Sequence, residues 1–228
     1  MTLNSAEPDI IIVGAGIAGL TAAYFLNRQG ISTRVIEADV RVGGRMTSDL
    51  INGHVVDRGA QFLSSEYSLI LDMQHRLGLE QQCRTTSQCS AIVRNSTPHN
   101  MRIDRPLDSL KLLSPYGMLK LAWHTLRFHH KQSTRSLSDY SQWAEFDTES
   151  AAAWSNGHIA KEVTEYLGEP MLHGFYFQTP EETSKSLAVA LTAIGIRRAK
   201  TISLKVGLGI LPETLARGLP SPDTGPLL

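Results

Sequence analysis

Glycines and an acidic residue near the amino-terminal end have the types and spacing of a dinucleotide site. Gly14, Gly16 and Gly19 form a G-x-G-x-x-G pattern, and Glu37 follows it at a separation of roughly 20 residues, as such sites require. In this pattern the first glycine allows a tight turn, the second lets a pyrophosphate approach the backbone, and the third lets a helix pack against a strand. The acid is placed to accept hydrogen bonds from an adenosine ribose. These residues predict a site for the ADP part that NAD and FAD share.

A second glycine-rich turn follows the acid. Gly43 and Gly44 permit close approach to the backbone, and Arg41 and Arg45 carry guanidinium groups that suit phosphate. A ligand that extends past the pyrophosphate toward a flavin could use such a turn. A surface turn with solvated arginines is the alternative, and composition alone does not separate the two.

The apolar pattern identifies the elements that must position these residues. Residues 9–13 form an aliphatic run typical of a strand buried on both faces. Residues 20–29 have helical character, and Gly30 stands where a helix-terminating glycine belongs. Residues 32–37 then resume strand character. Strand, glycine turn, helix and strand in this order predict an α/β fold that starts with a Rossmann-type βαβ unit.

Together these motifs resemble the amino-terminal signature of the flavin-containing amine oxidoreductase superfamily, which includes monoamine and polyamine oxidases, protoporphyrinogen oxidase and phytoene-type desaturases. The matching segments are Gly14-x-Gly16-x-x-Gly19-Leu20, Glu37-Ala38, Arg41-x-Gly43-Gly44-Arg45 and the stretch GHVVDRGAQF at 53–62. In the family, the turn in the last segment runs beside the flavin ring. The resemblance implies FAD as the cofactor, with these binding residues: Gly14, Ala15, Gly16, Ile17, Ala18, Gly19, Glu37, Ala38, Arg41, Gly43, Gly44, Arg45, Gly59, Ala60, Gln61 and Phe62.

The resemblance also implies a reaction, namely oxidation of a substrate C–H bond by hydride transfer to the flavin. The family acts on small molecules, some of them lipophilic. No nucleophile–base motif is evident in the sequence, which agrees with chemistry supplied by a cofactor. Catalytic residues therefore stay unassigned.

A second, shorter resemblance lies at 205–216, with the sequence KVGLGILPETLA. In the family, a glycine turn, Leu-Pro and a helix return the chain from the substrate region to the FAD domain. The alternative is a helix with a glycine-rich entry and Pro212 near its start. With this return, the predicted organisation is an FAD-binding part at 1–62, a largely helical substrate part without sustained β alternation at 63–200, and a returning part at 201–228.

Two clusters in the predicted helical part allow a functional interpretation beside a plainer one. The pair His129-His130 suggests a metal, but adjacent histidines point to different sides of a helix and no acid or cysteine stands at ligand spacing, so no metal site is expected. The same basic segment, with Trp123, could touch a membrane surface, although a packed helix is the plainer interpretation. The aromatic stretch at 173–177 could line a substrate pocket or belong to the core.

Composition restricts the class of protein. Lys+Arg and Asp+Glu are equal at 22 each, so no net field favours nucleic acid. Residues 10–26 are uncharged but lack the basic start of a signal peptide, and their glycines belong to the nucleotide motif, so neither a leader nor a transmembrane segment is expected. Cys83 and Cys89 are too few for a disulfide framework, which predicts a reducing, cytoplasmic setting.

Members of the family continue well beyond the equivalent of residue 216, so the resemblance predicts a truncated, amino-terminal half. The last residues, 220–228, have the composition of a disordered end. Three hypotheses stay open. The first is an FAD-dependent oxidoreductase of the amine-oxidase type, or its amino-terminal portion. The second is a non-catalytic nucleotide-binding remnant, or one subunit of a split enzyme completed by a second chain, and the third is an NAD-dependent dehydrogenase. The last leaves Gly43-Gly44-Arg45 without a role.

Overall fold

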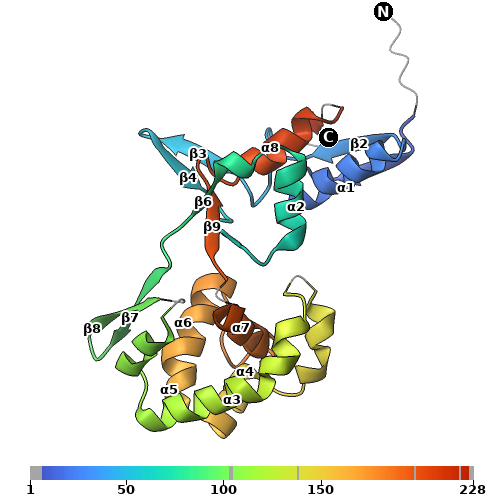
Figure 1. Cartoon of the computed structure of the whole chain (residues 1–228). Coiled ribbons are helices and arrows are strands. Elements are labelled where there is room, and N and C mark those ends of the chain that lie inside the picture. Colours follow the sequence, from blue (N-terminus) through green and yellow to red (C-terminus); the bar gives the residue numbers. More distant parts are fainter. Residues whose placement is uncertain (1–6, 103–104, 138, 198, 221, 226–228) are drawn as a thin grey trace, which may run out of the picture. The chain divides into compact units, whose positions relative to one another are not determined.

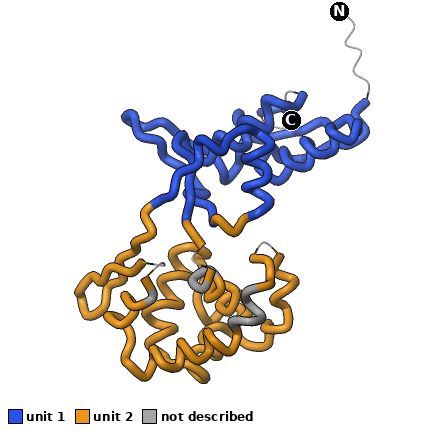
Figure 2. The backbone as a smooth tube through the Cα atoms, viewed as in Figure 1, with its two compact units in different colours: residues 1–64, 68–86, 201–228 blue, residues 65–67, 87–200 orange. Residues whose placement is uncertain are grey.

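The chain forms two compact units. The computed structural model describes residues 7–102, 105–137, 139–197, 199–220 and 222–225. As Figure 2 shows, unit 1 comprises residues 1–64, 68–86 and 201–228, and unit 2 comprises residues 65–67 and 87–200. Residues 68–86 thus group with the nucleotide-motif segments, although the sequence placed them in the helical part.

Unit 1 is an α/β unit that contains every motif of the predicted cofactor site. Its elements, labelled in Figure 1 where there is room, are β1 (Ile10–Val13), α1 (Ile17–Arg28), β2 (Thr33–Glu37), β3 (Ser48–Ile51), β4 (His54–Asp57), β5 (Leu63–Ser64), α2 (Ser68–Arg76), η1 (Glu80–Gln82), β6 (Cys83–Thr85), β9 (Thr201–Leu204), α8 (Ile210–Arg217) and β10 (Asp223–Thr224). Strands β1 and β2 are parallel, and α1 connects them. This arrangement confirms the predicted Rossmann-type βαβ start.

The parallel sheet has the order β1-β2-β10. Strand β10 lies in the segment for which the sequence predicted disorder. It pairs with β2, and the Arg34 Nε donates to the Asp223 Oδ2 at 2.5 Å. On the described residues, β1 is paired along one edge only, and its side chains Ile11 and Val13 are 58% and 77% exposed. A strand expected to be buried on both faces is therefore open.

Helices α1 and α8 lie side by side over the sheet (Figure 1). Leu20 of α1 and Leu211 and Leu215 of α8 are fully buried. Helix α1 ends before Gly30, which has φ +80° and donates its N–H to the Asn27 carbonyl at 3.0 Å. The core of unit 1 thus unites the first helix of the chain with the returning segment.

Unit 2 is mainly helical. Its elements are β7 (Cys89–Arg94), β8 (Thr97–Arg102), η2 (Pro106–Lys111), α3 (Pro115–Thr134), η3 (Tyr140–Phe146), α4 (Ala151–Trp154), η4 (Ser155–Ile159), α5 (Lys161–Val163), η5 (Thr164–Gly168), α6 (Glu169–Met171), η6 (Leu172–Tyr176) and α7 (Lys185–Arg197). The elements η4, η5 and η6 are π-helical turns that alternate with short α-helices. Trp143 and Val189 are fully buried in the core that these helices share.

An antiparallel hairpin, β7–β8, departs from the helical pattern predicted for this part. Its two-residue turn is formed by Asn95 and Ser96, both at positive φ (50° and 60°), which matches the twist of the flanking strands. Every residue of the two strands is exposed or half-buried, so the fold does not require an alternation of apolar and polar residues there.

Candidate functional site

The first glycine loop lies between β1 and α1, where the sequence placed it. Gly14 has φ +99°, and Ile17 begins α1, whose first turn carries no acidic residue. A Cβ on Gly19 would lie 2.1 Å from the Gly14 carbonyl oxygen, so only glycine allows this helix to approach the turn. The positive end of the α1 dipole is thus directed at the loop.

Glu37, at the end of β2, contacts this loop directly. Its Oε2 accepts from the Ala15 N–H at 2.6 Å, and its Oε1 accepts from the Asp39 N–H at 2.9 Å. Ala38, next to it, is exposed. The carboxylate is therefore held at the mouth of the first loop, the place where an adenosine ribose would be recognised.

The second glycine turn is joined to the first by the backbone. The Gly43 N–H donates to the Ala15 carbonyl at 2.8 Å, and Gly16 and Gly43 form an isolated parallel bridge. Gly43 has φ +114°, and a Cβ there would lie 2.7 Å from the Thr47 Cγ2. The two turns that the sequence suggested for one ligand are thus a single structure.

The third segment continues from the second turn. The Ala60 N–H donates to the Arg45 carbonyl at 3.0 Å, and the Arg58 N–H donates to the Thr47 carbonyl at 2.9 Å. A Cβ on Gly59 would lie 2.3 Å from the Arg45 carbonyl oxygen. Gln61 and Phe62 follow as exposed residues.

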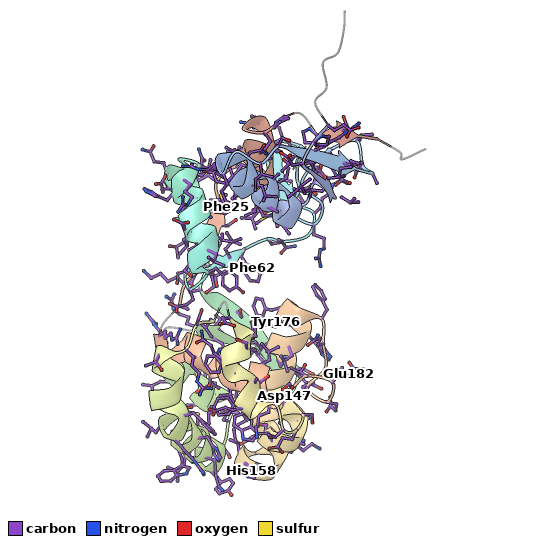
Figure 3. All side chains as sticks on the ribbon, turned by 90° about the vertical axis from the view of Figure 1, so that its right-hand side faces the viewer. Phe25, Phe62, Asp147, His158, Tyr176 and Glu182 are labelled. Carbon is purple, nitrogen blue, oxygen red and sulfur yellow. The ribbon has the colours of Figure 1, made fainter. Side chains whose placement is uncertain are left out.

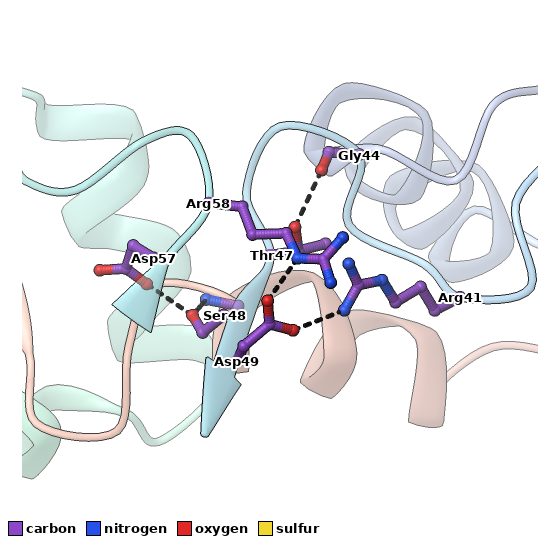
Figure 4. Close-up of polar contacts among 8 residues, drawn as sticks. Arg41, Gly44, Thr47, Ser48, Asp49, Asp57 and Arg58 are labelled. Carbon is purple, nitrogen blue, oxygen red and sulfur yellow. Dashed lines mark hydrogen bonds and ion pairs between the residues drawn. The ribbon is translucent and has the colours of Figure 1, made fainter. Parts of the chain in front are cut away.

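The returning segment at 205–216 joins the same structure. The Gly209 N–H donates to the Ser48 Oγ at 2.9 Å, and the Leu208 N–H donates to the Asp57 Oδ1 at 2.9 Å. Figure 4 shows the Ser48 hydroxyl donating in turn to Asp57 at 2.5 Å. Four segments that are distant in sequence therefore meet in unit 1.

A cavity of about 250 Å³ opens at this junction. Its lining residues are Asp39, Arg41, Gly44, Arg45, Thr47, Arg58 and Gly59. Cationic side chains outnumber the acidic one, which favours an anionic ligand group such as phosphate. Of the predicted site residues, Arg41, Gly44, Arg45 and Gly59 line it.

Asp49 orients the arginines of this cavity. Its Oδ1 accepts from the Arg41 Nη1 at 2.9 Å and its Oδ2 accepts from the Arg58 Nε at 2.5 Å (Figure 4). The Arg58 guanidinium, and after it that of Arg41, hold the pKa of Asp49 below its usual range.

The sequence interpretation did not assign Asp49, Arg58 or Thr47. The sequence does contain a signal that could have indicated the position of Asp49 near Arg58. Asn52 and Gly53, at φ 50° and 79°, form the two-residue turn of the β3–β4 hairpin. Asn-Gly is the strongest short-range hairpin signal and fixes the pairing of the strands. That register places Asp49 opposite Val56, near Arg58.

Unit 2 contains a larger and mostly apolar cavity, of about 500 Å³. Residues of all three π turns line it, including Ser155, Ile159, Thr164 and Leu172. The Ser155 Oγ is buried without a hydrogen-bond partner among the described residues. π-Helical turns occur frequently at functional sites.

The aromatic stretch at 173–177 does not line this cavity. Tyr176, labelled in Figure 3, forms a cluster with Tyr67 and Tyr140, and burial raises the pKa of Tyr176 above its usual range. Phe177 has φ 56° and is 89% exposed. The side chains of His129 and His130 lie outside the described residues. No cluster of three potential metal-ligating side chains is found in the part that the structure describes.

Residues 17–224 match the sequence model of the family "Flavin containing amine oxidoreductase". The chain is 32% identical to protoporphyrinogen oxidase 2 (chloroplastic/mitochondrial) of Arabidopsis thaliana over 77% of this chain and 34% of that protein. It is 40% identical to amine oxidase [flavin-containing] A of Sus scrofa over 36% of this chain and 16% of that protein. The structure of wild-type putrescine oxidase bound to putrescine has the same fold, with a TM-score of 0.70, 22% identity, and coverage of 93% of this chain and 49% of that one.

The chain belongs to the flavin-containing amine oxidoreductase family. It spans about a third of the length of the protoporphyrinogen oxidase and about half of the putrescine oxidase chain. Membership indicates FAD, not NAD, as the cofactor.

The described residues of unit 1 fit such a group. A Cβ on Gly14 or Gly16 would meet nothing within 4 Å, so the first loop leaves room for a pyrophosphate against its backbone. The amino-terminal end of α1 and the arginines of the adjoining cavity both favour its negative charge.

Proposed function

We propose that this chain is the FAD-binding, amino-terminal part of an oxidoreductase that removes a hydride from a C–H bond of a small molecule. The observation that carries the proposal is the junction in unit 1, where Gly43 bonds to Ala15 and Ala60 bonds to Arg45. This junction makes one continuous surface from the ribose position at Glu37 to the segment after β4. A site for ADP alone would not need the part of that surface that lies beyond the second glycine turn.

The residues of this surface have separate roles in the proposal. Gly14 to Gly19, as the turn and first helical residues, accept the pyrophosphate, while Glu37 and Ala38 hold the ribose. Arg41, Gly43, Gly44 and Arg45 support the flavin side of the pyrophosphate. Gly59, Ala60, Gln61 and Phe62 run beside the ring. When bound, the flavin supplies the hydride acceptor, and the protein binds and orients it.

The apolar cavity of unit 2 supports a lipophilic substrate. Its lining is mainly aliphatic, with Leu167 and Leu191 among the contributors, and Trp154 adds an aromatic ring. A cavity of about 500 Å³ lies in the range of ligand sites, roughly 300–1,000 Å³. We propose that it receives the apolar part of the substrate, and that Ser155 provides a hydroxyl for a polar group.

A binding module without catalytic activity is the second candidate. The open edge of β1, with Ile11 and Val13 exposed, favours it, because a Rossmann-type sheet is normally continued on both sides of this strand. We propose that further chain, in the same or a second polypeptide, pairs there. Substrate-dependent bleaching of the flavin by this chain alone would exclude the second candidate.

A titration with FAD, followed by absorbance and by retention of the flavin on gel filtration, tests the cofactor site. The wild-type chain is expected to retain FAD and not NAD. Replacing Glu37 by glutamine removes a charged acceptor for the ribose, so the Kd for FAD should rise about tenfold, as a charge-assisted hydrogen bond predicts. The matched control is Glu213→Gln on α8, which should leave the Kd unchanged. A colourless protein that does not bind added FAD would contradict the proposed site.

A reducing, cytoplasmic setting belongs to this proposal. Cys83 and Cys89 are free thiols, half-buried and exposed respectively, and an exposed free thiol suits a reducing compartment. Among the described residues, no helix has the length and apolar character needed to span a bilayer.

A further inference from the structure

Arg58 lies outside the set of residues that the family resemblance assigns to the cofactor, yet it lines the cavity of unit 1 together with Arg41 and Arg45. It follows β4 directly, and its side chain is 56% exposed, so a ligand in the cavity can reach it. Three guanidinium groups at one cavity of about 250 Å³ repel one another unless anions lie among them. The third arginine therefore needs a physical reason.

Asp49 is an anion that two of these arginines share. Its carboxylate accepts from the Arg41 Nη1 at 2.9 Å and from the Arg58 Nε at 2.5 Å (Figure 4). The Asp49 side chain is 25% exposed and is not part of the cavity lining. Two charge-assisted hydrogen bonds to one carboxylate fix both planar groups and reduce their mutual repulsion.

The arginines keep donors and positive charge for a ligand. A guanidinium group has five N–H donors, and Arg41 and Arg58 each give one to Asp49. Most donors of each group therefore stay available to a ligand or to water. With Asp49 counted, the three arginines exceed the two aspartates at the cavity by one charge. The arrangement thus suits an anionic group that has several oxygen atoms.

The cavity adjoins the first glycine loop. Gly44 lines the cavity, and a Cβ on Gly44 would lie 3.6 Å from the Gly16 Cα. Gly16 is the position at which a pyrophosphate can approach the backbone. The cavity therefore begins next to the loop that the pyrophosphate of FAD is proposed to occupy.

We propose that Arg58 is a further cofactor-binding residue, which donates to the pyrophosphate of FAD, and that Asp49 is a positioning residue, which holds Arg58 and Arg41 for this contact. The inference rests on the proposed function above, because it takes FAD as the ligand. A guanidinium group binds phosphate through two parallel N–H donors, and this contact needs a fixed orientation of the planar group. The charge of Asp49 alone would repel the pyrophosphate, so positioning and charge predict opposite effects of its removal.

Titration of the full chain with FAD tests both roles. Arg58→Gln should raise the Kd for FAD about tenfold, because a charge-assisted contact is lost. Asp49→Asn should raise the Kd about threefold or more, as coupling between contacting residues predicts, although the variant removes a negative charge near an anionic ligand. A Kd for Asp49→Asn that is unchanged or lower than that of the wild type would overturn the positioning role.

An ion pair on α2 provides matched controls. The Arg76 Nε donates to the Asp72 Oδ2 at 2.7 Å, the same kind of contact, and neither residue lines the cavity. Arg76→Gln and Asp72→Asn should leave the Kd for FAD unchanged. Circular dichroism of the ligand-free proteins must show that all variants keep the wild-type fold.

Two further variants show whether Asp49 acts through the arginines. Arg58→Lys keeps the positive charge but lacks the Nε donor to Asp49, so its Kd for FAD should lie between those of the wild type and Arg58→Gln. In the Arg41→Gln/Arg58→Gln background, Asp49→Asn should cause no further weakening, because nothing is left for it to position. A further weakening there equal to that in the wild-type background would refute action through the arginines.

ADP-ribose identifies the part of FAD that Arg58 contacts, because it carries the pyrophosphate without the flavin. Arg58→Gln should weaken ADP-ribose, measured by competition with FAD, by the same factor as FAD itself. Weakening of FAD alone would place Arg58 at the flavin ring and overturn the pyrophosphate contact. A wild-type chain that binds no FAD would overturn the proposed function and this inference with it, whereas wild-type binding with an unchanged Kd in Arg58→Gln would overturn this inference alone.

Discussion

In unit 1 the functional segments are joined by backbone hydrogen bonds, whereas in unit 2 the helices are joined by side-chain packing. The bond from Gly43 to Ala15 depends on a backbone conformation that one residue type allows. The core around Trp143 depends on volume and apolar character, which many residue combinations provide. The first kind of contact leaves a short motif in the sequence, and the second does not. Four substitutions test this contrast, from the largest expected effect to the smallest.

Trp143→Ala should have the largest effect on stability. The side chain is fully buried, and its Nε1 donates to the Ser136 carbonyl at 2.8 Å. Its removal leaves a cavity and deprives that carbonyl of this donor, for an expected loss of about 3–5 kcal/mol in the free energy of unfolding. Urea unfolding measures this loss. Trp123→Ala, at an exposed tryptophan of the same unit, should cost little, and equal losses in the two variants would refute the importance of packing around Trp143.

Gly43→Ala should affect unit 1 through the backbone alone. The new Cβ would meet Thr47 and the Met46 carbonyl, and alanine would have to adopt φ +114°. Strain of this kind costs on the order of 1–3 kcal/mol. Thermal unfolding and FAD retention measure it. Gly157→Ala is the control, because a Cβ there meets nothing within 4 Å at an ordinary φ. A Gly43→Ala protein with unchanged FAD binding would separate the second turn from the cofactor site.

Ser114→Ala removes the cap of α3. The Ser114 Oγ accepts from the Gly117 N–H at 3.1 Å and donates to Glu162 at 2.5 Å. Loss of a serine cap costs about 1 kcal/mol, so unit 2 should unfold at lower urea concentration. Ser141→Ala, at an exposed serine in η3, serves for comparison. No difference between these two variants would mean that the cap is redundant with tertiary packing.

Asp49→Asn should have the smallest effect, a loss of stability above the ordinary carboxyl pKa that disappears in acid. Because the pKa of Asp49 is lowered in the folded state by Arg58 and Arg41, its contribution is fully present above the ordinary carboxyl pKa, about 3.9. The contribution is lost as pH falls from there through the folded pKa. The variant should thus unfold with a weaker dependence on pH in that window, measured by fluorescence. Asp72→Asn, an exposed carboxylate of α2 outside the site, controls for net charge. An unchanged acid transition would show that the two arginines do not need this carboxylate.

The sequence was sufficient for most of unit 1. The βαβ start, the two glycine turns and the returning segment each depend on residues whose role is local, such as Gly30 at the end of α1. FAD as the cofactor was implied by the family resemblance that these motifs carry. The glycine motifs did not indicate the pairing of Arg41 and Arg58 through Asp49, because this pairing depends on the register of the β3–β4 hairpin and not on local spacing.

Unit 2 was predictable only in outline. The start of α3 carries a local signal, because Ser114 caps the helix and Pro115 is its first residue. The β7–β8 hairpin was missed, since Asn95-Ser96 is a weaker turn signal than Asn-Gly and no residue of either strand is fully buried. The π turns and the cavity that they line arise from tertiary packing, for which the sequence carries no short motif.

The insertion of unit 2 within unit 1 determines the order in which contacts can form. Residues 87–200 are contiguous and leave the ribosome before Thr201. The bonds from Leu208 to Asp57 and from Gly209 to Ser48 close loops of 151 and 161 residues. Contacts of such sequence separation form slowly, so unit 1 completes its fold last. Until then, β1 and the glycine turns belong to a partly folded chain in which α8 has not yet packed against α1. A chaperone or bound FAD would influence the yield of folded protein most during this interval.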